Sequence, residues 1–201
     1  MERNRSERDM ERLFIAVKVP SNLSGLLEKE SEKCSAKLKF AKWTHSEDYH
    51  ITLQFLGDTP RKEIPALLKA LEEISGKSKP FRLSLENWGT FGLPHAPKVL
   101  WAGVSGELAR LAELQRDVVN ATSGLGFKAE TREYNPHITL ARKYRGEQPF
   151  SAEELPDLRD CGGEKENNCS EKDWTVDAFV VYATRMHAIP MYEMIEKLTF
   201  F

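Results

Sequence analysis

The tetrapeptide His-Ile-Thr-Leu occurs twice in this chain, at residues 50–53 and again at residues 137–140. Each copy lies in a short run of apolar and β-branched residues, which is typical of a strand. Side chains alternate between the two faces of a strand, so each histidine shares a face with the threonine two positions later. The fold must therefore hold two His-x-Thr pairs on two stiff strands, and bringing the pairs together would create a symmetric site.

Strict alternation divides the residues around the first copy between two faces. One face receives the apolar side chains of Tyr49, Ile51, Leu53 and Phe55. The other face receives the polar side chains of His50, Thr52 and Gln54. In the second copy, the same alternation places His137 and Thr139 together, with Ile138 and Leu140 on the opposite face.

The segments that lead to the two copies follow a similar order. Residues 13–19 predict a buried strand ended by Pro20, followed by a helix capped by Ser21 and ending before Leu38. An extended piece at 38–43 and a polar loop at 44–48 then lead to the first copy. Before the second copy, a strand at 97–104 is followed by a helix at 107–122 and a short strand at 127–131. This recurrence indicates an internal duplication rather than an array of small repeats.

The rest of the chain completes one compact unit with two lobes, which we expect to span residues 13–201. A helix starts around 59–65 and ends at Gly76, and a strand covers 80–88 before a Gly/Pro loop at 89–96. Further strands are expected at 175–183 and 191–201. We expect residues 1–12 to be a flexible charged arm and residues 146–173 to be a polar surface insertion or lid.

Charge and cysteine content restrict the class of protein. Lys and Arg number 29 against 31 Asp and Glu, a formal charge of −2, so an anionic substrate must be held by a local patch. The odd cysteine count and the absence of a signal peptide indicate a cytoplasmic protein, expected to be a monomer. No apolar run approaches the ~20 residues needed to span a membrane. Cys161 and Cys169 could pair or bind metal, but two unpaired loop thiols are the favoured interpretation.

Two facing histidines suit general acid–base catalysis at phosphorus. The ordinary histidine pKa of ~6.5 lets one imidazole accept a proton from water while the other protonates the departing oxygen. Each threonine hydroxyl can donate to a phosphate oxygen. A single His-x-Thr arises often by chance, but two copies extended to the same tetrapeptide indicate a function. Neither copy contains a carboxylate or cysteine at ligand spacing, so we expect no metal and no cofactor.

The paired motifs resemble those of the 2H phosphoesterase superfamily, and the flanking residues resemble its RNA 2′,3′-cyclic phosphodiesterase branch, also called 2′-5′ RNA ligase. The resemblance covers roughly residues 13–145, with a weaker match at 178–198. The matching residues are Leu13-Phe14-Ile15-Ala16 with Pro20, Trp43, Phe55-Leu56-Gly57-Asp58, Phe91-Gly92, residues 97–103 and residues 135–142. The insertion at 146–173 is longer than expected for the family, and Thr184 stands where the family often has serine.

The resemblance implies an α+β fold. It is bilobal, with two antiparallel sheets related by pseudo-twofold symmetry around a central cleft and helices on the outside. It also implies hydrolysis of 2′,3′-cyclic phosphate at RNA ends to a 2′-phosphate, with His50 as proton donor and His137 as proton acceptor. Thr52 and Thr139 would bind substrate. Arg142 is a further candidate phosphate ligand, since a guanidinium forks onto phosphate oxygens.

Strict alternation, however, places Arg142 opposite His137, and a solvated strand-end arginine is the competing interpretation. Phe14, Trp43 and Phe91 are candidates for stacking on a base or ribose, although aromatic residues at such positions are often core. The remaining histidines have no companion motif and are interpreted as ordinary loop or surface residues. They are His45, His95 and His187.

Two alternatives stay open. The same site could join a cyclic end to a 5′-hydroxyl as a 2′-5′ bond, or the chain could be an RNA-end binding module without chemistry. The sequence leaves several substrates open: tRNA ends, other RNA, a small cyclic nucleotide or an ADP-ribose cyclic phosphate.

Overall fold

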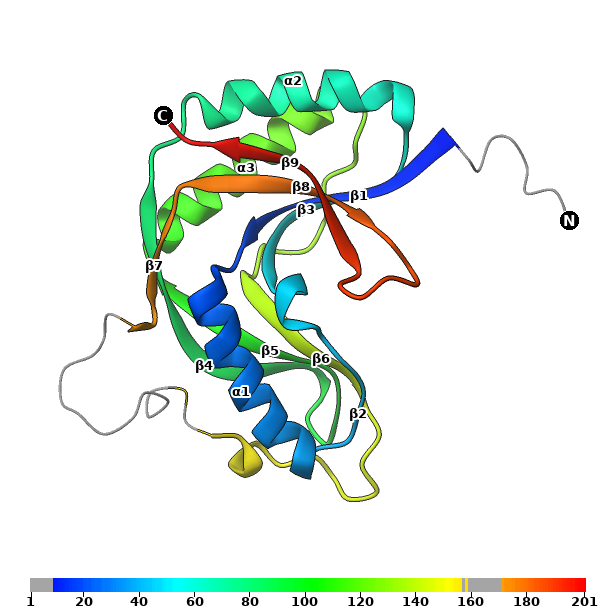
Figure 1. Ribbon diagram of the computed structural model, residues 1–201, viewed down its shortest axis with the longest axis vertical. Coiled ribbons are helices and arrows are strands. Elements are labelled where there is room, and N and C mark those ends of the chain that lie inside the picture. Colours follow the sequence, from blue (N-terminus) through cyan, green and yellow to red (C-terminus); the bar gives the residue numbers. More distant parts are fainter. Residues whose placement is uncertain (1–8, 157, 159–170) are drawn as a thin grey trace, which may run out of the picture.

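The computed structural model describes residues 9–156, 158 and 171–201. These residues form one curled antiparallel sheet with flanking helices (Figure 1). The strands are β1 Met10–Lys18, β2 Phe40–Trp43, β3 His50–Pro60, β4 Phe81–Leu93, β5 Ala96–Gly106, β6 His137–Tyr144, β7 Asp173–Val176, β8 Ala178–Thr184 and β9 Tyr192–Thr199. The α-helices are α1 Ser21–Lys37, α2 Ile64–Ser75 and α3 Leu108–Ser123. Short 3₁₀ turns are η2 Ser46–Asp48, η3 Arg61–Glu63 and η4 Ala152–Glu154.

The sheet has two halves that meet at the two motif strands. Its strand order is β7-β4-β5-β6-β3-β1-β8-β9, and β2 pairs with β6. One register pair, Ile51 with Ile138, joins β3 to β6. The two sheets predicted from the resemblance are thus the two halves of one continuous sheet, curled into a C in Figure 1. The predicted α+β fold, with the two motifs at the centre, is confirmed.

The predicted duplication appears as two strand–helix–strand units. β1 is followed by α1 and pairs antiparallel with β3, while β5 is followed by α3 and pairs antiparallel with β6. Each connecting helix covers the opposite half. Cys34 of α1 packs with Leu100 of β5 and Ala141 of β6, whereas Thr122 of α3 donates a hydrogen bond to Gln54 of β3 at 2.6 Å. The two halves are therefore interlocked through their helices, as Figure 1 shows.

Both motif strands carry a β-bulge at the same place. In β3, Thr52 pairs with Ala16 and Gln54 with Ile15, which leaves Leu53 as the extra residue. Strict alternation is therefore wrong beyond Leu53. Gln54 points into the core, only 2% exposed, and Phe55 points to the histidine face, 53% exposed.

In β6 the extra residue is Leu140, because Thr139 pairs with Trp101 and Ala141 with Leu100. The bulge brings Arg142 onto the histidine face. The prediction that alternation would place Arg142 opposite His137 is wrong for this reason.

Other strand predictions also needed correction. The expected Gly/Pro loop at 89–96 is instead the end of a hairpin, in which β4 continues to Leu93 and β5 starts at Ala96. No strand forms at residues 127–131. The expected strand at 175–183 breaks at Asp177 into β7, which pairs with β4, and β8, which pairs with β1. α1 starts at Ser21 itself, after Pro20, with no side-chain cap.

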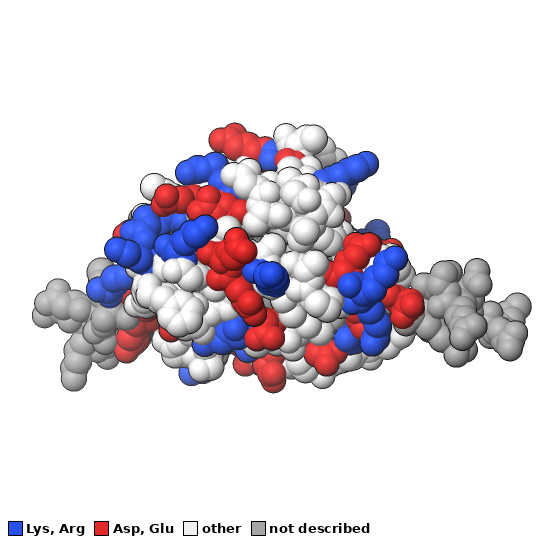
Figure 2. Space-filling view, turned by 90° about the horizontal axis from the view of Figure 1, so that it is seen from above, with Lys and Arg blue, Asp and Glu red and all other residues white. Residues whose placement is uncertain are grey.

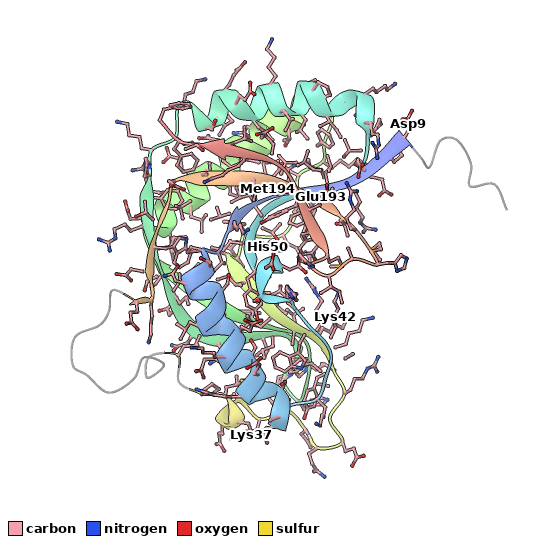
Figure 3. The ribbon with its side chains drawn as sticks, viewed as in Figure 1. Asp9, Lys37, Lys42, His50, Glu193 and Met194 are labelled. Atoms are coloured by element: carbon pink, nitrogen blue, oxygen red, sulfur yellow. The ribbon has the colours of Figure 1, made fainter. Side chains whose placement is uncertain are left out.

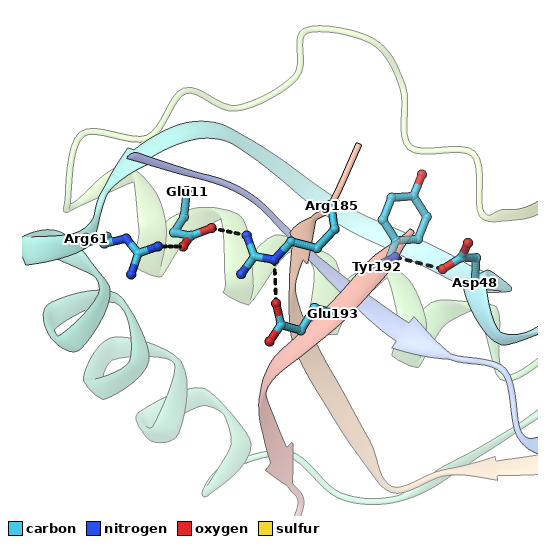
Figure 4. A network of polar contacts seen from close by, with 6 residues as sticks. All are labelled: Glu11, Asp48, Arg61, Arg185, Tyr192 and Glu193. Atoms are coloured by element: carbon cyan, nitrogen blue, oxygen red, sulfur yellow. Dashed lines mark hydrogen bonds and ion pairs between the residues drawn. The ribbon is translucent and has the colours of Figure 1, made fainter. Parts of the chain in front are cut away.

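The prediction of a flexible arm is wrong for residues 10–12, because β1 already begins at Met10 and pairs with the end of β3. Glu11, only 6% exposed, anchors this start through ion pairs to Arg61 and Arg185, and Arg185 also binds Glu193 (Figure 4). Residues 1–8 lie outside the described residues, as do residues 157 and 159–170 of the predicted insertion, which include Cys161 and Cys169.

Opposite charges are interspersed over the face of the molecule seen in Figure 2, with no field of one sign. This distribution fits the nearly balanced composition and leaves anion binding to local groups. Among the described residues, no helix has the length and apolar character needed to cross a membrane.

Candidate active site

The two His-Ile-Thr-Leu copies meet side by side at the centre of the sheet. Ile51 pairs with Ile138, and in an antiparallel ladder the residues that flank such a pair also face one another. His50 therefore lies across from Thr139, and Thr52 lies across from His137. The sequence prediction that the four side chains share one surface agrees with this register. Thr52 and Thr139 are both half-buried, as are the two histidines.

Aromatic rings surround His50. The ring centroid of His50 lies 4.9 Å from that of Phe14 and 5.2 Å from that of Tyr192, which packs edge-on. Tyr182 lies 6.1 Å away. Phe55, turned to this face by the bulge, lies 5.9 Å from Phe14. The first imidazole is therefore set among rings that limit access of water.

His137 has a similar but smaller aromatic wall. Phe91 packs edge-on at 4.9 Å and Trp101 lies at 6.1 Å, with Phe91 and Trp101 5.2 Å apart. Two of the predicted stacking residues, Phe14 and Phe91, thus contact the histidines. Trp43 does not lie in these walls. It pairs with Ala141 and packs on Phe40, at 5.6 Å, on the α1 side of the sheet.

The two histidines are oriented in the same way. The Nδ1 atom of His50 lies 2.6 Å from the carbonyl oxygen of Asp48, and that of His137 lies 2.7 Å from the carbonyl oxygen of Asn135. A carbonyl can only accept a hydrogen bond, so Nδ1 carries the proton in both rings. The Nε2 atom of each neutral imidazole is left with its lone pair, which is the arrangement a general base needs.

Burial lowers the pKa of both histidines. Loss of solvation lowers the pKa of His50 to about 4, against the raising effect of its hydrogen bond to Asp48. Burial also lowers the pKa of His137, and the positive charge of Arg142 lowers the pKa of both. Both imidazoles are therefore neutral at pH 7.

Arg142 is the arginine whose positive charge acts on both motif histidines. Its positive charge acts on the pKa of His50, of His137 and of Tyr192, so it lies near all three side chains. Val99 on β5 and Lys42 on β2 are its register partners. Its exposed guanidinium is available to an anion bound over the histidines.

Asp48 is a residue of the site that sequence reasoning missed. Its carboxylate accepts hydrogen bonds from the backbone amides of Met191 and Tyr192, both at 2.9 Å, and Figure 4 shows the one from Tyr192. Its carbonyl holds His50. Asp48 therefore fixes both the imidazole and the ring of Tyr192 that packs against it. No local sequence pattern predicts this role, because the partners of the carboxylate are Met191 and Tyr192, which are far from Asp48 in the sequence.

The remaining histidines lie outside the two motifs. His45 accepts a hydrogen bond from the amide of Glu47, His95 lies in the β4–β5 turn and His187 is exposed in the β8–β9 connection. Among the described residues, no group of three or more His, Cys, Asp or Glu side chains could hold a metal ion. Cys34 is buried, and burial raises the pKa of its thiol to about 11.

Comparison with known proteins identifies close relatives. A family model described as the 2′-5′ RNA ligase superfamily matches residues 27–187. A protein of Geobacillus stearothermophilus named RNA 2′,3′-cyclic phosphodiesterase is 42% identical over 182 residues, covering 90% of this chain and 55% of the relative. A protein of Bacillus subtilis (strain 168) with the same name is 32% identical over 184 residues, covering 92% of this chain and 93% of the relative.

Solved structures share the fold. The crystal structure of TT0787 of Thermus thermophilus has a TM-score of 0.68 and 27% identity, covering 94% of this chain and 97% of that one. Escherichia coli LigT complexed with 3′-AMP has a TM-score of 0.72 at 20% identity, covering 95% of this chain and 98% of that one. The curled sheet and its helices are thus those of LigT-like proteins.

Proposed function

Because this chain belongs to the 2′-5′ RNA ligase superfamily, we propose that it hydrolyses 2′,3′-cyclic phosphates at RNA ends to 2′-phosphates. The family resemblance drawn from the paired motifs is thereby confirmed, and relatives bear the name of this activity. The observation that carries the proposal is the register of the two motifs around Ile51 and Ile138, which sets two oriented imidazoles on one surface.

In the proposed reaction His137 acts as the base and His50 as the acid. Nε2 of His137 removes a proton from water as the water oxygen forms a bond to phosphorus. The bond between phosphorus and O3′ breaks, and Nε2 of His50 gives its proton to O3′. The product keeps the phosphate on O2′. Each proton transfer is worth about 10² to 10⁴ in rate.

Protonation of His50 follows from substrate binding. The free site holds the pKa of His50 at about 4, so the acid form is scarce at neutral pH. The negative phosphate placed beside the imidazole raises this pKa by favouring the charged ring. Binding of the cyclic phosphate therefore favours the protonated form of His50, which is the acid the reaction needs. The aromatic rings of Phe14 and Tyr192 pack against this imidazole and shield it from water.

Thr52, Thr139 and Arg142 are proposed to hold the phosphate. The two hydroxyls lie across from the opposite histidines and can donate to the non-bridging oxygens, where negative charge increases in the transition state. Arg142 adds a positive charge on the same face. No protein carboxylate is required at the phosphorus, and we propose that the reaction proceeds without metal.

The test is turnover of an oligonucleotide with a 2′,3′-cyclic phosphate in the presence of excess chelator. We expect a 2′-phosphate product at the rate seen without chelator. Loss of turnover on chelation would refute metal independence, and a 3′-phosphate product would refute the assigned direction of opening. Binding of a 2′-phosphorylated oligonucleotide with no turnover of the cyclic form would instead favour the RNA-end binding module.

Ligation is the second candidate function, and the description of the matching family favours it. The same two proton transfers, with a 5′-hydroxyl in place of water, would join that hydroxyl to the cyclic end as a 2′-5′ bond while O3′ leaves. Product analysis with both ends supplied separates the two reactions. We propose that hydrolysis dominates in water. We also propose that the protein is cytoplasmic and acts as a monomer, and gel filtration would check the oligomeric state.

A further inference from the structure

A pocket of about 410 Å³ is lined by residues of α1, of the segment 42–49 that leads to His50, and of the segment 188–191. We propose that this pocket binds the nucleobase of the nucleotide that precedes the cyclic-phosphate end. The inference rests on the proposed function and names its substrate class as RNA of at least two nucleotides. The catalytic histidines do not line the pocket, so it is a separate subsite.

The pocket and the active site share a wall. Asp48 and Tyr49 line the pocket and directly precede His50. Met191 also lines it, and the next residue, Tyr192, packs its ring edge-on against His50 at 5.2 Å. The carbonyl of Asp48 holds His50 and its carboxylate holds the amide of Met191, so the lining of the pocket is continuous with the residues that position His50.

The walls of the pocket suit a flat ring with polar edges. Trp43 is half-buried and held by its edge-on contact with Phe40 at 5.6 Å, so its position is fixed. Ile189, 83% exposed, and Met191 offer apolar surface, while Ser35 and Thr44 bring hydroxyls. A nucleobase has apolar faces for the first group and hydrogen-bonding edges for the second.

The charges decide which part of the nucleotide enters. Glu28 and Glu32 line the pocket and repel a phosphate, whereas a neutral base meets no such penalty. Lys42 is the only Lys or Arg side chain of the described lining. It is the register partner of Arg142 and binds Met191 Sδ at 3.4 Å through its Nζ. In Figure 3 Lys42 lies below His50.

This order of groups fits one strand of RNA. Arg142 holds the cyclic phosphate, Lys42 holds the phosphodiester that joins the last two nucleotides, and the base before that phosphodiester enters the pocket. Base–aromatic stacking tolerates any base, so the subsite adds affinity for chain length rather than for sequence.

The test measures binding of product analogues, which needs no turnover. A dinucleotide 2′-phosphate is compared by calorimetry with the mononucleotide 2′-phosphate, and with a dinucleotide whose first residue is abasic. We expect the complete dinucleotide to bind about tenfold more tightly than either. Equal affinity of the complete and abasic dinucleotides would overturn the proposal, because the phosphodiester alone would then explain any gain.

Variants locate the effect. Trp43→Ala should remove most of the difference between the complete and abasic dinucleotides. Trp43 packs on Phe40, so its loss can unfold the protein. Ile189→Ala is therefore the second variant, because the exposed side chain of Ile189 contributes little to the stability of the fold. Phe201→Ala removes an exposed ring elsewhere and should keep the difference. An unchanged difference in folded Trp43→Ala or in Ile189→Ala would count against this pocket.

The same materials separate this inference from the proposed function. Turnover of a mononucleotide 2′,3′-cyclic phosphate tests the histidines alone, since that substrate carries no preceding base. Hydrolysis of the mononucleotide together with equal binding of complete and abasic dinucleotides would sink the subsite and keep the enzyme. Absence of hydrolysis together with a base-dependent gain in binding would refute the proposed function and keep the subsite.

Discussion

Ile51 of the first motif is the cross-strand partner of Ile138 of the second, and this pair joins the two halves of the sheet. Both side chains are fully buried, so packing of the core fixes the register. A shift of one strand by one residue would turn its His-x-Thr pair to the face opposite the other pair. The stability of the fold and the geometry of the site are thus set by the same contact.

Loss of either of the two imidazoles proposed to be catalytic should slow turnover strongly without loss of the fold. We expect His50→Ala and His137→Ala each to lower kcat by about 10² to 10⁴. His50→Asn is a sharper variant, because its amide can still donate to the carbonyl of Asp48 while the Nε2 function is gone. Rate measurements on a cyclic-phosphate oligonucleotide, with circular dichroism for folding, check this.

The exposed His187 provides the matched control. His187→Ala should keep wild-type turnover, and a comparable loss there would point to an unspecific effect of removing histidine. Full activity of folded His50→Asn would refute acid catalysis by His50.

The pH dependence should be shifted to the acid side. The active form has one histidine protonated and one neutral, and burial lowers the pKa of both, to about 4 for His50. The alkaline limb of kcat/KM, which reports the free enzyme, should therefore have its midpoint below the ordinary histidine value of ~6.5. The limb of kcat should lie at higher pH, because bound phosphate raises the pKa of the imidazoles. A kcat/KM midpoint above about 7 would contradict the burial effect.

Each threonine hydroxyl should contribute through the transition state. Thr52→Val and Thr139→Val keep the shape of the side chain and remove the donor, and we expect kcat to fall by about 10². Thr52→Ser and Thr139→Ser restore the hydroxyl and should recover most of the rate. If the serine variants were as slow as the valine variants, packing rather than hydrogen bonding would explain the loss.

Arg142 should act mainly on phosphate affinity. Arg142→Ala removes a charge-assisted contact and should weaken binding of a 2′-phosphorylated product by about 10- to 100-fold. Arg142→Lys keeps the charge but not the planar fork, so an intermediate affinity is expected. Arg116→Ala on exposed α3 is the control and should bind as the wild type does. Unchanged affinity in Arg142→Ala, measured by calorimetry, would support the competing interpretation of a solvated arginine.

The sequence predicted most elements and the four motif residues because these depend on local patterns. Apolar periodicity and Pro20 delimit β1 and α1. The repeated tetrapeptide indicates which histidines and threonines form the candidate site. The bulges at Leu53 and Leu140 could not be predicted, because an extra residue in a ladder depends on the partner strand. For the same reason, the face of β3 on which Phe55 lies could not be predicted, because it depends on the bulge at Leu53. The hairpin beyond Trp88 was missed because its Gly and Pro residues are also typical of loops.

Asp48 is the residue whose role depends most on the tertiary structure. Asp48→Ala removes two charged hydrogen bonds to the amides of Met191 and Tyr192, and we expect the free energy of unfolding to fall by about 2–4 kcal/mol. Turnover should fall as well, because Tyr192 would no longer be held against His50. Hydrogen exchange should accelerate at these two amides beyond the general change in stability. Asp48→Asn keeps one acceptor and should be intermediate, while Asp117→Ala on exposed α3 should leave all three measurements unchanged. Wild-type exchange at both amides in Asp48→Ala would show that the carboxylate does not fix the start of β9.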